Sequence, residues 1–185
     1  MALFTGKGDD GTTKLFDSPS GVRVSKSGAI FECLGQLDEL NTMVGWCGIV
    51  ASGLNVAGRP GNVVLTEVQN HLFTIQAEVA GASKSVAPES VTAMSSMILM
   101  IEGELPVITT FLVPGGTELA ARLDMVRAVS RRVERRLVTL HESGERTISE
   151  SSRAYANRLS SLFYALGRLA NQQGGITEQS PTYDA

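Results

Sequence analysis

A regular apolar spacing between residues 119 and 140 constrains the fold of this chain more than any other feature. Apolar residues and one serine recur there at steps of four and three: Leu119, Leu123, Val126, Ser130, Val133, Leu137 and Leu140. This spacing places them on one face of a long helix, and such a face is typical of a helical bundle. The turn Pro114-Gly115-Gly116 precedes this helix, and the hydroxyl of Thr117 can cap its first turn.

A second stripe on the same helix is rich in arginine. At about 100° per residue, Arg127, Arg131 and Glu134 lie within roughly 60° of one another. Arg135 lies at the edge of this stripe, and Arg132 points elsewhere. Because arginines on one face repel each other, the stripe favours an anionic occupant such as a polyphosphate. The alternative is a solvated face with ion pairs between neighbouring turns.

Similar spacing predicts four further helices. Three of them cover residues 29–52, 62–82 and 88–105. The last begins at a capping box formed by Thr147 and Glu150 and ends at about residue 173. On the last helix the residues opposite the apolar face are Arg153, Asn157, Ser160, Tyr164 and Arg168. We therefore predict an all-α fold in one domain, residues 1–185. Its core is a five-helix bundle of the ferritin-like up-down type over 29–173, with an irregular glycine-rich N-terminal loop, 1–28, and a flexible tail, 174–185.

Composition narrows the class of protein. A chain of 185 residues with 43% hydrophobic residues and a net charge of −3 is typical of a soluble globular protein and not of a nucleic-acid-binding one. No apolar run approaches the roughly 20 residues that a membrane span needs. Cys33 and Cys47 lie on one predicted helix, about 21 Å apart, which is too far for a disulfide. Cysteines that form no disulfide suit a reducing compartment, so a cytoplasmic location is expected. With only two histidines the chain cannot assemble a zinc or ferritin-type di-iron site.

The segment TGKGDDGTT, Thr5 to Thr13, has many backbone N–H groups, one lysine and several hydroxyls, so it can wrap phosphates. It contains the pattern GxGxxG, but the helix that a dinucleotide fold requires does not follow. Asp9 or Asp10 can hold Mg²⁺ or orient the loop. The alternative is a disordered acidic arm. Phe111 lies in the apolar segment 107–113, where a phenylalanine is ordinarily part of the core.

Several segments in this order resemble the PduO-type ATP:cob(I)alamin adenosyltransferases. They are TGKGDDGTT, LDELN in the first predicted helix, FLVPGG followed by RAVSRRVERR, and NRLSSLF. The similarity is collinear from Thr5 to about Phe163. The loop departs from the family's common start, Thr-Lys/Arg-Thr-Gly-Asp, because the basic residue Lys7 is shifted by one place.

The resemblance implies that the chain transfers the 5′-deoxyadenosyl group of ATP to the cobalt of cob(I)alamin, giving adenosylcobalamin and triphosphate. It places ATP at Thr5, Gly6, Lys7, Gly8, Asp9, Thr12, Thr13, Lys26, Arg131, Glu134, Arg135 and Asn157. It also implies an ion pair of Asp38 with Arg127 on the corrinoid side, and a Phe111 that crowds the lower face of cobalamin. Phe111, Asp38, Arg127 and Arg131 are thus the expected catalytic residues. From spacing alone, we expect Glu134 to order Arg131 and Arg135.

The resemblance further implies Mg²⁺, a homotrimer with active sites between subunits, a cobalamin reductase as partner and an adenosylcobalamin-dependent enzyme as recipient. The residues leave two alternatives open. One is a helical protein that binds nucleotide or corrinoid to sense or deliver the cofactor without turnover. The other is a structural bundle whose arginine stripe meets the acidic helix of a partner.

Overall fold

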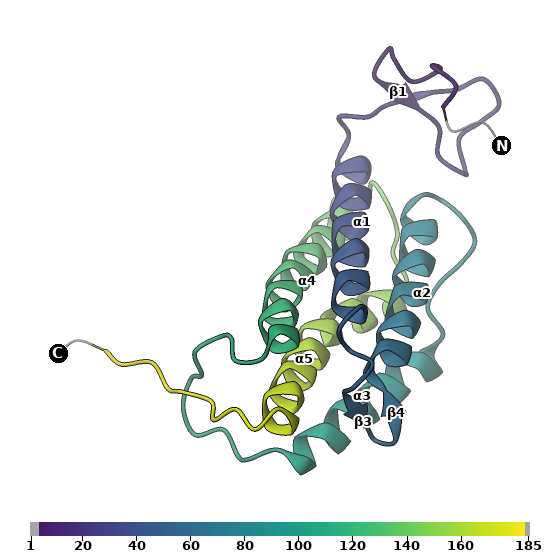
Figure 1. Cartoon of the computed structure of the whole chain (residues 1–185). Coiled ribbons are helices and arrows are strands. Elements are labelled where there is room, and N and C mark those ends of the chain that lie inside the picture. Colours follow the sequence, from purple (N-terminus) through teal and green to yellow (C-terminus); the bar gives the residue numbers. More distant parts are fainter. Residues whose placement is uncertain (1–3, 184–185) are drawn as a thin grey trace.

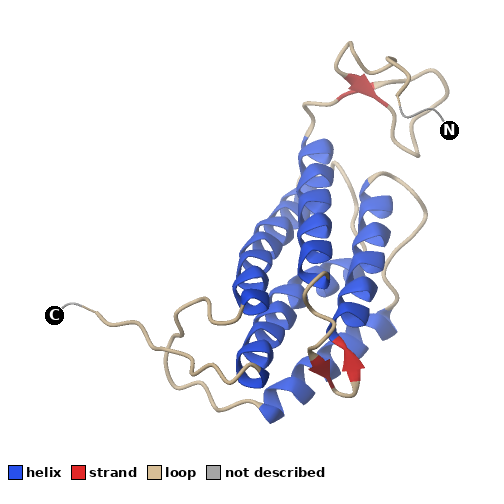
Figure 2. Cartoon of the chain, in the orientation of Figure 1, coloured by secondary structure: helices blue, strands red, loops and turns tan. Residues whose placement is uncertain are grey.

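Five helices make up most of the chain (Figures 1 and 2). The computed structural model describes residues 4–183, so residues 1–3 of the predicted loop and 184–185 of the predicted tail lie outside it. The helices are α1 (Ala29–Gly48), α2 (Gly61–Val79), α3 (Pro88–Glu104), α4 (Glu118–Glu142) and α5 (Glu150–Gln173). Helix α1 packs against α2 and α4, and α5 packs against α4 and α3. The prediction of an all-α, five-helix fold is confirmed.

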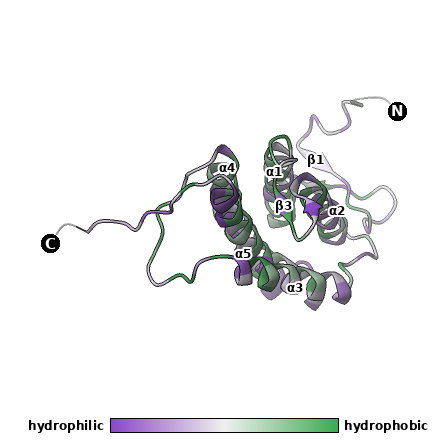
Figure 3. Cartoon of the chain, turned by 60° about the horizontal axis from the view of Figure 1, so that its bottom comes forward, coloured by the Kyte–Doolittle hydropathy of each residue, from purple (hydrophilic) through white to green (hydrophobic). Residues whose placement is uncertain are grey.

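The core forms where the predicted apolar faces meet. Every residue of the α4 spacing is buried, including Ser130, whose hydroxyl donates to the carbonyl of Arg127 at 2.8 Å. The buried residues of α5 include Leu159, Leu162, Phe163, Leu166, Leu169 and Ala170. Figure 3 shows α1 and α2 side by side, with α4, α5 and α3 following one another around them. None of the helices in residues 4–183 has the length and apolar character that crossing a membrane requires.

The start of α4 was predicted correctly, and the start of α5 was not. Thr117 caps α4, since its hydroxyl accepts from the N–H of Ala120 at 3.2 Å. In α5 the cap is Ser149, whose hydroxyl accepts from the N–H of Ser152 at 3.2 Å, so the predicted capping box from Thr147 is wrong. The carboxylate of Glu78 accepts from the N–H of Ser149 at 2.7 Å. This contact from α2 fixes where the helix begins.

Short strands lie in the N-terminal loop, which was predicted to be irregular, and between the first two helices. In the N-terminal loop β1 (Thr12–Thr13) pairs antiparallel with β2 (Val24–Ser25). Between α1 and α2, β3 (Asn55–Val56) pairs with β4 (Arg59–Pro60), and α1 ends at Gly48 instead of residue 52. The turn of this second hairpin has positive φ at Ala57 and Gly58, as tight hairpin turns require. Strands of two residues carry too little periodic pattern to be found from sequence.

The N-terminal loop projects beyond the end of the bundle where α1 begins (Figure 1). Its base is attached at two adjacent residues. The N–H of Phe16 donates to the carbonyl of Ala80 at 2.8 Å, and Arg146 pairs with the carboxylate of Asp17 at 2.5 and 3.3 Å. The loop therefore has a defined root on the α2–α3 and α4–α5 connections.

We expect both cysteines to be unreactive in the folded protein. Cys33 and Cys47 are free and buried in the core, and burial raises the pKa of each thiol to about 11. At pH 8 almost no thiolate is present, and the thiolate is the nucleophile. An aromatic disulfide reagent should thus label neither thiol in native protein within minutes, and both in guanidinium chloride. Native labelling at the rate of the denatured protein would contradict this placement.

Candidate active site

The connection between α3 and α4 loops away from the bundle (Figure 1), and Phe111 is one of its residues. Its side chain is 78% exposed, which excludes the reading of Phe111 as a core residue. It lines a pocket of about 810 Å³, which we call the Phe111 pocket. The other lining residues are Ile108, Thr109, Thr110, Leu112, Arg127, Arg131, Ser160, Ser161 and Tyr164. An apolar connection thus faces a polar and cationic wall made by α4 and α5.

Arg127 is held on this wall by its own helix and by α5. Its Nε lies 3.7 Å from the carboxylate of Asp124, one turn earlier on α4. Its guanidinium carbon lies 5.8 Å from the ring centre of Tyr164 on α5. Burial raises the pKa of Tyr164, so the phenol stays protonated at neutral pH and can donate a hydrogen bond into the pocket.

A second pocket, of about 490 Å³, lies further along the arginine stripe, and we call it the Asn157 pocket. It is lined by Arg131, Glu134, Arg135, Val138, Thr139 and Asn157. The amide of Asn157 on α5 donates to the carboxylate of Glu134 on α4 at 2.6 Å. The carboxylate makes no ion pair with either neighbouring arginine among residues 4–183, so Glu134 orders Asn157 instead of the predicted arginines.

Arg131 belongs to both pockets and separates one from the other. No described residue forms an ion pair with Arg131 or Arg135, whereas the next residue, Arg132, pairs with Glu39 of α1 at 2.8 Å. The structure therefore brings five predicted residues to one surface of α4 and α5, and Phe111 lies opposite them. The five are Arg127, Arg131, Glu134, Arg135 and Asn157. Two exposed guanidinium groups that lack carboxylate partners in residues 4–183 make this surface suited to an anion.

The phosphate-type loop is ordered by its own side chains. Lys26 donates to the carbonyl of Gly8 at 2.9 Å, and a Cβ at Gly8 would lie 2.8 Å from the same ammonium nitrogen. The carboxylate of Asp10 accepts from the N–H and the hydroxyl of Thr12 at 2.9 and 2.7 Å, which lowers the pKa of Asp10. Asp10 is therefore a loop-orienting residue. Sequence reasoning missed Arg23, which donates to the hydroxyl and the carbonyl of Thr12, both at 2.6 Å.

Within one chain, the described residues of the N-terminal loop and Asp38 make no contact with the two pockets on α4 and α5. In the described part of the chain, no hydrogen bond or ion pair joins loop residues 5–13 to α4 or α5, and neither pocket includes a loop residue. Asp38 is exposed on α1 and makes no ion pair with Arg127, whose carboxylate neighbour within the chain is Asp124. The loop and Asp38 therefore do not reach these pockets in a single chain.

The sequence analysis placed Ser160 and Tyr164 on the same side of the last helix as Asn157 but did not assign them to the site, and it left out Ser161. All three line the Phe111 pocket. They follow Asn157 on α5 at steps of three and four, and that spacing was the available signal. Arg168 was predicted to lie on the same outer side, but it is 7% exposed and pairs with Glu178 at 2.9 Å. Glu178 of the tail covers Arg168, and the apolar spacing of the helix does not predict this contact.

Comparison with known proteins decides the family. The model of the cobalamin adenosyltransferase family matches residues 3–170, which include both pockets and the loop. The chain belongs to this family. It is 39% identical to the corrinoid adenosyltransferase PduO of Citrobacter freundii over 91% of this chain and 49% of the relative. It is 34% identical to a corrinoid adenosyltransferase of Bacillus subtilis over 95% of this chain and 90% of the relative.

Solved structures of the family share the whole fold. A variant of the PduO-type ATP:corrinoid adenosyltransferase of Lactobacillus reuteri, complexed with cobalamin and ATP, matches with a TM-score of 0.87. The two chains are 25% identical, and the match covers 98% of this chain and all of the other. The chain spans about half the length of the PduO proteins of Citrobacter freundii and Salmonella typhimurium, 49% and 55% respectively. The family match ends before the tail.

Proposed function

We propose that this chain transfers the 5′-deoxyadenosyl group of ATP to the cobalt of cob(I)alamin, giving adenosylcobalamin and triphosphate. The observation that carries the proposal is the position of Arg131 in the wall of both pockets. A nucleotide in the Asn157 pocket and a corrinoid over the Phe111 pocket would meet at this side chain. The activities named for the relatives, and a similar structure that holds cobalamin and ATP, support the same reaction.

The proposed step is a displacement at carbon. The electron pair of Co(I) attacks the ribose 5′-carbon, the Co–C bond forms, and the C5′–O bond breaks as triphosphate leaves. Negative charge grows on the triphosphate, and the guanidinium groups of Arg131 and Arg135 would stabilise it, as would the ammonium groups of Lys7 and Lys26. This step transfers no proton, so it needs no side-chain general base. The cobalt supplies the reactivity, and the protein supplies position and charge.

Phe111 would act on the lower face of the corrinoid. Its exposed ring stands between Ile108 and Leu112 in the lining of the Phe111 pocket, which Arg127 and Arg131 also line. An apolar ring there would keep the axial base and water from the cobalt. Co(II) without an axial ligand is reduced to Co(I) more easily, so this placement would assist the step that generates the nucleophile.

Mg²⁺ would enter with ATP. It is usually bound through substrate phosphates and one or two carboxylates, and it neutralises phosphate charge. Asp9 lies in the loop with an exposed side chain, whereas the carboxylate of Asp10 is occupied by Thr12. Asp9 is therefore the carboxylate of the loop that fits this role.

We also propose a homotrimer whose active sites lie between subunits. The loop of one chain would complete the pockets of the next, because within one chain it contacts neither. Asp38 would likewise pair with Arg127 of a neighbouring subunit. Three exposed apolar residues of the single chain would be covered by such contacts. Trp46 on α1, Ile49 directly after α1 and Met125 on α4 are 43%, 75% and 57% exposed.

Mixed trimers test this arrangement. Lys26→Ala removes a loop cation and Arg131→Ala a helix cation, so each variant alone should be weakly active. Refolding the two together should restore activity well above the sum of the separate samples, because some sites then receive both intact halves. Arg131→Ala mixed with Arg135→Ala is the control, since both changes affect the same half, and should show no recovery. No recovery in the first mixture, with mixed trimers present, would place loop and helix in one chain.

The activity itself is tested by anaerobic visible spectroscopy with purified protein, ATP, Mg²⁺ and chemically reduced cob(I)alamin. The expected result is the spectrum of adenosylcobalamin, with one triphosphate released for each product formed. Binding of ATP and cobalamin without product would show a sensing or delivery protein instead. Binding of neither would show a structural bundle.

We place the reaction in the cytoplasm, with a cobalamin reductase as electron source and an adenosylcobalamin-dependent enzyme as recipient of the product.

A further inference from the structure

The connection that carries Phe111 has little apolar packing of its own. Val107, Ile108, Phe111 and Val113 are 88%, 43%, 78% and 51% exposed. Figure 3 shows this connection as a largely hydrophobic stretch that loops away from the helices. The Phe111 pocket lies against residues 108–112, and a second cavity of about 390 Å³ also lies against this stretch. Packing alone therefore does not fix the position of the connection.

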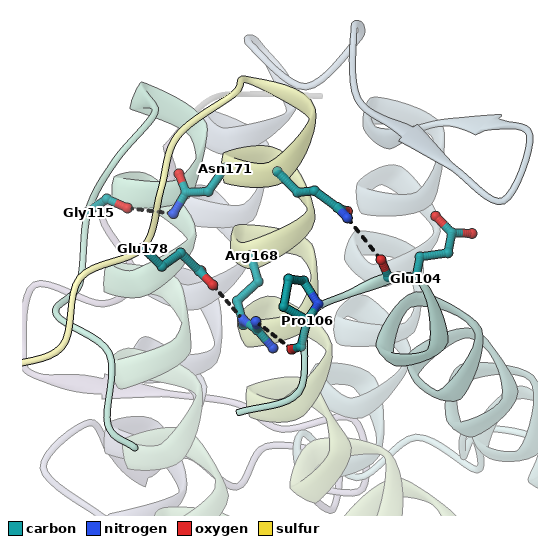
Figure 4. Close-up of polar contacts among 7 residues, drawn as sticks. Glu104, Pro106, Gly115, Arg168, Asn171 and Glu178 are labelled. Atoms are coloured by element: carbon teal, nitrogen blue, oxygen red, sulfur yellow. Dashed lines mark hydrogen bonds and ion pairs between the residues drawn. The ribbon is translucent and has the colours of Figure 1, made fainter. Parts of the chain in front are cut away.

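Polar contacts from the end of α5 fix it instead (Figure 4). Arg168 donates to the carbonyl of Pro106 at 3.0 Å, and Gln172 donates to the carbonyl of Glu104 at 2.9 Å. At the other end, Asn171 donates to the carbonyl of Gly115 and accepts from the N–H of Thr117, both at 2.9 Å. Both ends of the connection are thus attached to one turn of one helix.

Gly116 shows how close the attachment by Asn171 is. Its φ is +108°, a conformation that side chains rarely allow, and a Cβ there would lie 2.2 Å from the amide oxygen of Asn171. The glycine turn predicted from the sequence is therefore needed for a contact between the connection and α5, as well as for the change of chain direction.

The tail completes these attachments. Glu178 accepts from Nε of Arg168 at 2.9 Å, and their side chains are 18% and 7% exposed (Figure 4). The carbonyl of Gln179 accepts from the N–H of Val113 at 2.8 Å, and Ile176 donates to the carbonyl of Asn171 at 2.9 Å. The predicted flexible tail, 174–185, is thus attached at its start, and its flexibility stays a prediction. We call residues 176–179 the strap.

We propose that the strap positions the connection that carries Phe111, and that Arg168 and Glu178 are positioning residues for the corrinoid side of the site. Arg168 bonds the strap through Glu178 and the connection through Pro106, so one buried guanidinium joins the two segments. A buried arginine without its carboxylate is costly, so the strap and the arginine require each other. The proposal rests on the function proposed above, because it assigns the strap to the cobalamin side of the site. Neither Arg168 nor any residue of the strap lines the Asn157 pocket, so ATP binding is not expected to depend on them.

Glu178→Gln is the test variant, since it removes the charge and keeps the size of the side chain. Glu104→Gln is the matched control, because Glu104 contributes only its main-chain carbonyl to the attachment. Glu178→Gln should raise the cob(II)alamin concentration for half-maximal turnover about tenfold, the scale of a lost charged hydrogen bond. Its half-saturating ATP concentration should match that of the control, while its melting temperature should be lower, because the buried Arg168 loses its carboxylate partner.

Hydrogen exchange followed by mass spectrometry provides the second readout. Amides of residues 106–113 should exchange faster in Glu178→Gln than in Glu104→Gln, while α1 exchanges equally in both. A chain truncated after Gly175 should show the same two effects more strongly. Unchanged exchange and unchanged cob(II)alamin kinetics in both variants would overturn the proposal. If wild-type protein makes no adenosylcobalamin, the proposed function fails, and the exchange measurement still tests the strap separately.

Discussion

Replacing Arg131 with alanine should raise the half-saturating ATP concentration about five- to more than a hundredfold, the equivalent of about 1–3 kcal/mol for a lost charged hydrogen bond. The exposed guanidinium lies in the wall of both pockets and pairs with no carboxylate among the described residues. Its removal therefore takes a cation from the nucleotide and disturbs no ion pair of the fold. Steady-state kinetics with ATP varied, at saturating cob(I)alamin, measure the effect.

Arg132→Ala is the matched control for this change. The residue is adjacent on α4 and carries the same charge, but it pairs with Glu39 on α1 and lines neither pocket. Such a surface ion pair contributes about 0–1 kcal/mol to stability, so this variant should keep its ATP constant and its fold. Equal ATP constants in the two variants would show that the triphosphate does not lie on the arginine stripe.

Replacing Phe111 with alanine should slow turnover that starts from cob(II)alamin by roughly ten- to a hundredfold, since losing the apolar contact of one phenylalanine costs about 1.5–3 kcal/mol. The half-saturating ATP concentration should stay the same, because Phe111 is not part of the Asn157 pocket. The melting temperature should also stay the same, because a side chain that is 78% exposed leaves no cavity when it is removed.

Val107→Ala is the corresponding control, because Val107 is another exposed apolar residue of the connection and does not line the Phe111 pocket. Visible spectra of bound cob(II)alamin add a direct test, since the Phe111→Ala variant should retain more of the axially ligated form. Parallel losses of ATP binding and turnover in Phe111→Ala would mean that the residue supports the structure in general instead of the lower face of the corrinoid.

The sequence predicted the helices well because each has a regular apolar face. Every position in the spacing from Leu119 to Leu140 is buried on α4, although the spacing left out the buried Ala120 and Val129, and Thr117 was recognised as the cap. The start of α5 was misplaced, since a carboxylate from α2, that of Glu78, selects Ser149 as the cap. The hairpin strands were missed because they are two residues long.

For the site, the sequence by itself determined which residues of α4 share a stripe, because a helix of known period fixes the direction of each side chain. Only the tertiary structure decided what faces that stripe. It placed Asn157 against Glu134, exposed Phe111 and buried Arg168 beneath the tail. These are contacts between segments far apart in the chain, which no local period encodes. The physical reason is that local spacing sets the faces of a helix, while the packing of segments on one another decides which face becomes a site.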